Sequence, residues 1–190
     1  LRGTPTMYYG DEIGIAKVEI PPDRVQDPWE KNEPGLGIGR DPERTPMQWE
    51  AGATAGFSTC TPDKLYLPVS TDGGRITVAA EEQDRASMLH FVRTLISLRQ
   101  QTPALGNTAA WALLSDKDKP YPMVYQRSLD GQVYVVALNP SEKAVKATIP
   151  TQGGRAKAVM MSGKASYKPG KTTDQLVLGK FTAVVYRIGQ

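Results

Sequence analysis

The sequence predicts a mixed, mainly β fold in which a long loop and one helix precede an antiparallel β-sandwich. Three observations lead to this class. From residue 106 onward, short runs of alternating apolar and polar residues follow one another between turn residues. One stretch before them repeats its apolar residues at helical spacing. Ahead of that stretch, residues 10–84 hold eight of the 15 prolines, which predicts irregular structure.

The composition is that of an ordinary globular protein. The chain has 190 residues, of which 39% are hydrophobic, and a formal net charge of +3. This balance gives no face for nucleic acid or an anionic membrane, so we expect neither partner. No apolar run approaches the roughly 18 residues of a membrane span. The single cysteine, Cys60, cannot form an internal disulfide and favours a cytoplasmic location, although the compartment stays open.

The first element is expected at residues 6–9 (Thr-Met-Tyr-Tyr), where β-branched and aromatic residues between Pro5 and Gly10 predict a buried strand. Because the chain begins with Leu1 and reaches this strand at once, we expect a longer polypeptide upstream. Residues 10–84 predict one long loop, with a short helical turn near its start at 21–25. A long ordered loop in a compact domain is usually a functional wall or lid.

Residues 84–101 predict an amphipathic helix. Asp84 is a good N-cap, apolar residues such as Met88 and Leu95 recur at helical spacing, and Pro103 ends the run. His90, the only histidine, lies off the densest part of the apolar stripe, so we interpret it as solvated or packed. With no cluster of Cys, His and carboxylate residues around it, the sequence predicts neither a metal site nor another cofactor.

Residues 106–190 predict the sandwich. Turn signals such as Asp130-Gly131 separate short strands at the spacing of roughly 8–12 residues that is typical of antiparallel sandwiches. The strands are expected near residues 110–115, 123–128, 133–138, 144–149, 156–161, 176–178 and 183–188.

The most distinctive part of the loop is residues 39–49. Two prolines there remove backbone donors and fix φ, which predicts a rigid loop rather than a regular element. Such a loop holds Arg40 and Arg44 at defined positions, where their guanidinium groups suit the hydroxyl pairs of polyols, or carboxylates. The alternative is that either arginine pairs with a neighbouring acid, Asp41 or Glu43, and only staples the loop.

The adjacent carboxylates Asp11 and Glu12 are a tempting pair for a glycosidase, which needs two carboxyl groups facing one bond. Adjacent residues at a strand end point in different directions, however. We therefore interpret Asp11 as a turn acceptor and Glu12 as the partner of an arginine or a backbone amide. Of the loop's tryptophans, Trp49 is expected to pack within the loop, whereas packing and sugar stacking are equally open for Trp29.

Five segments, in order, closely resemble the C-terminal part of α-glucosidases and oligo-1,6-glucosidases in the α-amylase family. They are residues 3–14 (Gly-Thr-Pro-Thr-Met-Tyr-Tyr-Gly-Asp-Glu-Ile-Gly), 27–30 (Asp-Pro-Trp-Glu), 39–49 (Gly-Arg-Asp-Pro-Glu-Arg-Thr-Pro-Met-Gln-Trp), 55–58 (Ala-Gly-Phe-Ser) and 95–99 (Leu-Ile-Ser-Leu-Arg). One departure is Tyr66, which stands in a Leu-Tyr-Leu-Pro run where Pro-Trp-Leu-Pro is usual.

The resemblance implies the C-terminal end of a catalytic (β/α)8 barrel, with its last strand, long loop and last helix, followed by the family's C-terminal β-sandwich. The respective ranges are 1–105 for the barrel end, with strand 6–9, loop 10–84 and helix 84–101, and 106–190 for the sandwich. Barrel enzymes build their sites from loops at the C-terminal ends of the strands. The implied activity is that of a retaining, exo-acting α-glucosidase, oligo-1,6-glucosidase-like, which hydrolyses α-glucosidic bonds in short oligosaccharides.

The resemblance also assigns site residues and partners. Arg44 is expected to donate to hydroxyls of the non-reducing glucose, and Arg40 to hold or supplement it. The catalytic carboxylates would lie upstream of Leu1, so no catalytic residue is assigned here and the fragment should be inactive alone. The implied partners are a gluco-oligosaccharide substrate and the missing N-terminal barrel. Without that barrel, the lone strand is expected to be stabilised by the sandwich, by self-association of the fragment through its unpaired edge, or not at all.

Two alternatives belong to other functional classes. One is a non-catalytic amylase-like scaffold, against which Arg40 and Arg44 argue, because a scaffold needs no sugar-facing guanidinium groups. The other is a stand-alone carbohydrate-binding sandwich, which would need exposed coplanar aromatic residues, and Trp111 is one candidate.

Overall fold

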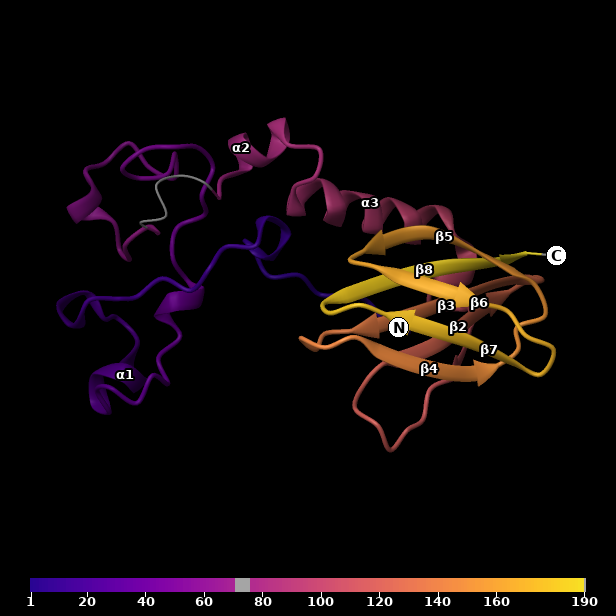
Figure 1. Cartoon of the computed structure of the whole chain (residues 1–190). Helices are drawn as coiled ribbons and strands as arrows, with labels where there is room; N and C mark the ends of the chain where they lie inside the picture. Colours follow the sequence, from indigo (N-terminus) through magenta and orange to yellow (C-terminus); the bar gives the residue numbers. More distant parts are fainter. Residues whose placement is uncertain (71–75, 190) are drawn as a thin grey trace. The chain divides into compact units, whose positions relative to one another are not determined.

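The computed structural model describes residues 1–70 and 76–189 (Figure 1). Residues 71–75, which belong to the predicted loop 10–84, and residue 190, at the end of the predicted sandwich, lie outside the described residues. The chain divides into two compact units. One unit is Pro5–Thr94, and the other combines Leu1–Thr4 with Leu95–Gln190.

The larger unit contains two antiparallel sheets (Figure 1). One has five strands in the order β1-β2-β3-β8-β5, and the other has three in the order β4-β7-β6. The strands are β1 (Ala110–Leu113), β2 (Met123–Leu129), β3 (Gln132–Asn139), β4 (Val145–Pro150), β5 (Arg155–Ser162), β6 (Ala165–Lys168), β7 (Thr173–Leu178) and β8 (Thr182–Gly189). The predicted mainly β fold with an antiparallel sandwich is therefore confirmed, and β6 is the strand that the sequence prediction missed.

The core of this unit is formed by apolar side chains from both sheets. In β7, every second residue is buried, so one face of the strand contributes to the core and the other is exposed. The buried cluster consists of Val124, Val135, Ala137, Ile149, Leu176, Leu178, Val184 and Tyr186. The buried Asp174 interrupts the apolar pattern of β7, and this polar residue explains why only 176–178 was predicted as a strand.

The turn between β2 and β3 follows the expected chemistry. Asp130 and Gly131 connect the two strands and have positive φ angles of 48° and 77°. Two consecutive residues with positive φ give the turn whose twist matches that of an antiparallel hairpin, and Asp-Gly is a favoured pair for it. The turn predicted at these residues is confirmed.

The predicted helix 84–101 is present, but it begins later. Asp84 ends α2 (Val78–Gln83) as its C-cap, and its carboxylate accepts from the amide of Ala86 at 2.8 Å. The helix α3 (Met88–Gln101) starts after Ser87, whose hydroxyl accepts from the amide of His90 at 3.3 Å. Two short polar residues compete for the cap position, and the hydroxyl rather than the carboxylate caps α3.

The apolar residues of α3 are only partly covered, with Phe91, Val92 and Leu98 half-buried. Met88 is 48% exposed and Ile96 44% exposed, and Leu89 is the residue of the helix that is buried. Helices of this length depend on packing of their apolar face for most of their stability.

The strand predicted at residues 6–9 is wrong for this chain. The structure gives this segment no regular secondary structure, and it pairs with none of the described strands. Met7 and Tyr8 are exposed. The β-branched and aromatic composition favours a strand, but a strand forms only when a neighbour completes its hydrogen bonds.

The smaller unit is built from short turns around a small core. Its helical elements are η1 (Asp11–Ile13), η2 (Pro22–Arg24), α1 (Pro28–Asn32), η3 (Asp41–Glu43), η4 (Pro62–Lys64) and α2, together with the first residues of α3. The helical turn expected near 21–25 is thus confirmed as η2. Ile13, Met47 and Leu89 form the buried cluster. Within the two described ranges, no helix combines the length and the apolar character needed to cross a membrane.

Candidate functional site

The two candidate arginines flank the single helical turn η3. Arg40 is its N-cap residue and Arg44 its C-cap residue, and the amide of Arg44 donates to the carbonyl of Asp41 at 2.9 Å. Pro42 lies in the first turn, where its missing N–H costs no hydrogen bond. The predicted rigid loop is thus a short 3₁₀ turn that places the two guanidinium groups close together.

Both arginines face the carboxylate of Asp27. Arg40 Nε donates to Asp27 Oδ2 at 2.8 Å, and Arg44 Nη1 lies 3.7 Å from the same oxygen. The Asp27 side chain is fully buried, whereas those of Arg40 and Arg44 are 53% and 46% exposed. The arginines therefore share a buried anchor and keep free donors at the surface. The alternative that an arginine only staples the loop assumed pairing with Asp41 or Glu43. Arg40 does pair with an acid, but that acid is Asp27.

Asp27 also fixes the start of α1. Its Oδ1 accepts from the amide of Trp29 at 2.9 Å, which is the contact of a helix N-cap. The hydrogen bond from Arg40, followed by that from Trp29, lowers the pKa of Asp27 to about 2. In turn, Asp27 raises the pKa of Arg40. The carboxylate is consequently charged at any pH at which the protein would work.

Acid is expected to destabilise the unit Pro5–Thr94 through Asp27. The folded pKa is about 2, and a carboxyl of this kind has a pKa of about 3.9 in an unfolded chain. Because the folded value is lower, Asp27 stabilises the fold at higher pH and loses this contribution as the pH falls from about 4 toward 2. Fluorescence of Trp29 and Trp49 during acid titration measures the effect. The Asp27→Asn variant should show a shallower transition, and identical transitions would contradict this role.

Arg44 lines a pocket of about 450 Å³ together with several aromatic side chains. The hydroxyl of Tyr9, in the wall, donates to the carbonyl of Thr45 at 3.0 Å and so holds the arginine segment. The lining residues are Tyr9, Glu12, Arg44, Thr45, Pro46, Met47, Trp49, Phe57, Tyr66 and Leu67. A guanidinium fork beside aromatic faces is suited to a neutral polyhydroxylated ring, because it offers both hydrogen bonds and stacking.

The aromatic residues of this region are exposed. Trp49 is 51% exposed, so the prediction that it packs inside the loop is wrong, and Trp29 is 63% exposed. The backbone at Trp49 is nevertheless fixed, since its carbonyl accepts from the amide of Ala79 at 2.9 Å. On the sandwich, Trp111 was the candidate for sugar stacking. Its ring centroid lies 6.1 Å from that of the buried Tyr125, which indicates that the two rings pack together.

The adjacent acids near the start of the chain serve the backbone, as predicted. Asp11 Oδ2 accepts from the amide of Tyr8 at 3.0 Å, and Glu12 Oε2 accepts from the amide of Gly10 at 2.8 Å. His90 is half-buried, with its ring Nε2 3.3 Å from the carbonyl of Glu82. Across residues 1–70 and 76–189, no group of three or more His, Cys, Asp and Glu side chains is arranged to hold a metal ion.

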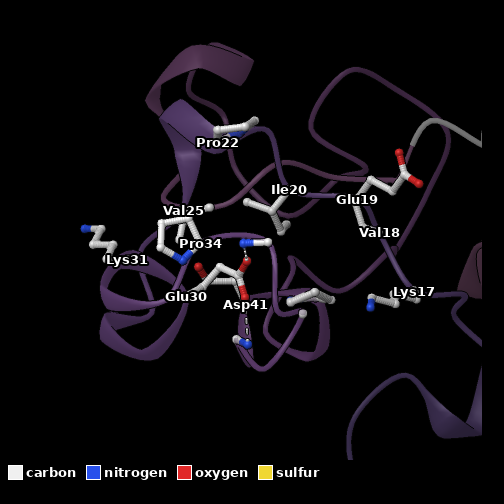
Figure 2. A pocket seen from close by; sticks show the side chains of 14 residues that line it. Lys17, Val18, Glu19, Ile20, Pro22, Val25, Glu30, Lys31, Pro34 and Asp41 are labelled. Carbon is white, nitrogen blue, oxygen red and sulfur yellow. Dashed lines mark hydrogen bonds between the residues drawn. The ribbon is translucent and has the colours of Figure 1, made fainter.

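A second pocket of about 560 Å³ lies in the same unit, beside Glu30 (Figure 2). The carboxylate of Glu30 accepts from the amides of Gly35 and Gly39, at 2.9 and 3.1 Å, and so closes the intervening segment into a loop (Figure 2, dashed lines). A Cβ atom at Gly39 would lie 2.7 Å from the Cβ of Glu30. Asp41 and Pro42 of η3 line this pocket, whereas the C-cap residue Arg44 lines the aromatic pocket.

The sequence prediction missed Asp27 as part of the site. Its signal was visible only as an N-cap before Pro28 at the start of a short helix. Its pairing with Arg40, thirteen positions along the chain, has no local pattern. The structure thus brings together both predicted arginines and adds the buried carboxylate that they share.

Comparison with known proteins identifies the family. The family model described as "Alpha amylase, catalytic domain" matches residues 1–108. The chain is 33% identical to an oligo-1,6-glucosidase of Parageobacillus thermoglucosidasius, over 79% of this chain and 29% of that protein. It is 35% identical to a trehalose synthase/amylase of Mycobacterium tuberculosis, over 69% of this chain and 20% of that protein.

Solved structures of similar fold point to the same group of proteins. A variant of the trehalulose synthase MutB from Pseudomonas mesoacidophila, in complex with glucose, matches with a TM-score of 0.82 and 28% identity, over 99% of this chain and 36% of that chain. The chain therefore spans only 20–36% of the length of these proteins. Because the family model covers more than half of its residues, the chain belongs to the α-amylase family.

Proposed function

We propose that this chain is part of a retaining, exo-acting α-glucosidase that hydrolyses α-glucosidic bonds in short gluco-oligosaccharides. The observation that carries the proposal is the pocket in which Arg44 meets the rings of Tyr9, Trp49 and Tyr66. It offers a glucose residue both hydrogen-bond donors and aromatic faces. The name of one relative, oligo-1,6-glucosidase, supports the same substrate class.

The proposal assigns residues 1–105 to the C-terminal end of the catalytic barrel and residues 106–190 to its C-terminal sandwich. The two catalytic carboxyl groups then belong to polypeptide outside this chain. Supporting this, Asp11 and Glu12 are engaged with backbone amides rather than facing each other across a bond. The chain by itself is accordingly expected to be inactive, with Arg44 and Arg40 serving as substrate-binding residues only.

A second candidate is transfer of the glucosyl unit to a sugar instead of to water. The names of two similar proteins, a trehalose synthase/amylase and a trehalulose synthase, favour it. A retaining glycosidase forms a covalent glucosyl intermediate, which a water molecule normally resolves. A sugar hydroxyl that reaches the same intermediate would give transfer, so the two candidates differ in the acceptor alone.

The test is an assay of the full-length protein on isomaltose, maltose, trehalose and sucrose. Release of α-glucose as the first product, followed by proton NMR, is expected for retaining hydrolysis. Conversion of a disaccharide into an isomer with little free glucose would favour transfer. Failure to consume any of the four sugars would overturn the proposal. The 190-residue chain, assayed in parallel, is expected to give no turnover.

The chain on its own is expected to self-associate. Several large apolar side chains are exposed, among them Met7, Tyr8, Met88 and Ile96, and exposed apolar surface favours association. Light scattering coupled to size exclusion should give a mass that rises with concentration. A double Met88→Ser/Ile96→Ser variant should reduce the effect, whereas Thr94→Ser, on the same helix, should not. A monodisperse monomer over the whole concentration range would contradict this expectation.

A further inference from the structure

Two buried carboxylates, those of Asp27 and Asp41, join the segment at residues 26–27 to the segment that carries the arginines. Asp41 Oδ2 accepts from the backbone amides of Gln26 and Asp27, at 2.6 and 2.8 Å. In the opposite direction, Asp27 Oδ2 accepts from the backbone amide of Arg40 at 3.2 Å, in addition to its side chain. A carboxylate from each segment therefore accepts hydrogen bonds from backbone amides of the other segment. Both carboxylates are almost fully buried, so water competes little for these hydrogen bonds.

We propose that Asp27 is a positioning residue that orients both arginines and keeps the site selective for neutral sugars over anions. The inference rests on the proposed function, since it takes Arg44 to face a glucose residue. Asp27 itself has no exposed side-chain surface and acts only through the guanidinium groups of Arg40 and Arg44.

The orientation follows from how the two oxygens of Asp27 are used. Oδ1 is committed to the amide of Trp29, so the carboxylate cannot turn without uncapping α1. Oδ2 is consequently fixed where Arg40 Nε and Arg44 Nη1 both approach it. Arginine side chains have many rotamers, and restricting them in advance reduces the entropy that substrate binding costs.

The selectivity follows from charge. Two half-exposed guanidinium groups side by side are a common recognition set for phosphate, because their planar forks match its oxygens. The negative charge of Asp27 lies against both guanidinium groups, offsets part of their positive charge and occupies Arg40 Nε. The remaining donors of Arg44 then suit uncharged hydroxyls. Without this charge, the pair should attract anions more strongly.

The test is the Asp27→Asn variant of the full-length enzyme. The side-chain oxygen of asparagine can still accept from the amide of Trp29, and the substitution removes the negative charge. For 4-nitrophenyl α-glucoside, KM should rise about tenfold while kcat changes by less than about threefold, as expected when substrate binding is weakened equally in the ground state and the transition state. Inhibition by inorganic phosphate should become about threefold or more stronger, because the charged donors are released. Simple loss of folded protein would lower activity without strengthening phosphate binding.

Asp84→Asn is the matched control. Asp84 also accepts from an amide two positions along the chain, that of Ala86, but it is exposed and forms no ion pair within the described ranges. Its kinetic constants and phosphate inhibition should equal those of the wild type. If Asp27→Asn does not fold, Asp27→Ser keeps an N-cap acceptor without the charge.

A double variant separates this inference from the proposed function. Because Asp27 acts through Arg44, Asp27→Asn should add less than about twofold to the loss in an Arg44→Ala background. Wild-type KM and phosphate inhibition in Asp27→Asn, or a fully multiplicative loss in the double variant, would overturn the inference. If no glucoside is turned over, or if Arg44→Ala is fully active, the proposed function fails. Calorimetric titration of phosphate into the same proteins then still decides the selectivity claim.

Discussion

Replacing Arg44 by alanine in the full-length enzyme is expected to lower kcat/KM for isomaltose by about 100-fold. Arg44 is the cation among the residues that line the aromatic pocket. Hydrogen bonds between a charged donor and a ligand contribute about 2–3 kcal/mol when water is excluded, and each 1.4 kcal/mol corresponds to about tenfold. Steady-state kinetics should show a higher KM together with a lower kcat.

Two further substitutions sharpen this prediction. Arg44→Lys keeps the charge and loses the planar fork, so its loss should lie between that of Arg44→Ala and the wild type. Arg85 is exposed and outside the pocket, and Arg85→Ala should stay within about twofold of the wild type. A loss of less than twofold for Arg44→Ala would contradict the assignment of the pocket to glucose.

Replacing Asp174 by alanine is expected to destabilise the sandwich by about 2–4 kcal/mol, since buried donors left unpaired carry their full desolvation cost. Asp174 is fully buried in β7. Its carboxylate accepts from the Tyr167 hydroxyl and from the amides of Gln152 and Gly170, the last two at 2.9 and 3.0 Å. The free energy of unfolding in urea, at neutral pH, measures the loss.

The pH dependence provides an independent check. Burial alone would raise the pKa of Asp174, but the hydrogen bonds from Tyr167, Gly170 and Gln152 outweigh it and hold this pKa below its ordinary value. Its stabilisation is thus present at neutral pH and is lost as the pH falls below the ordinary value of about 3.9. The difference between wild type and Asp174→Ala should shrink in acid. Gln175→Ala, an exposed neighbour in β7, should change stability little at either pH.

The elements that were predicted correctly depend on local signals. The Asp130-Gly131 turn and the alternation within β8 are each set by residues that are close neighbours in the sequence, so the sequence alone specifies them. The helix α2 was not predicted. Its six residues are too few to establish a helical period, although Thr77 caps it through a bond to the amide of Ala80.

The features that could not be predicted depend on distant partners. Residues 6–9 have strand composition, but a strand requires a hydrogen-bonding neighbour, and none of the described strands provides one. The proline-rich loop drew attention to Arg40 and Arg44, and the family resemblance gave them a role, whereas their anchor Asp27 became visible only in three dimensions. A buried carboxylate that joins two loop segments leaves no periodic trace, because its partners are set by how those segments meet.

The two hydrogen bonds to Glu30 separate the position of the arginine pair from changes in the adjacent loop, residues 35–39. Since Glu30 ties the amides of Gly35 and Gly39 together, the chain leaves the loop at a fixed point, immediately before Arg40. Insertions or deletions at the tip would then alter the rim of the pocket beside Glu30 while the guanidinium groups keep their place. A Cβ at position 39 would lie 2.7 Å from the Cβ of Glu30, so a residue other than glycine there would require Glu30 to move. Changes at the tip of this loop should therefore reshape the pocket beside Glu30 and leave the aromatic pocket in place.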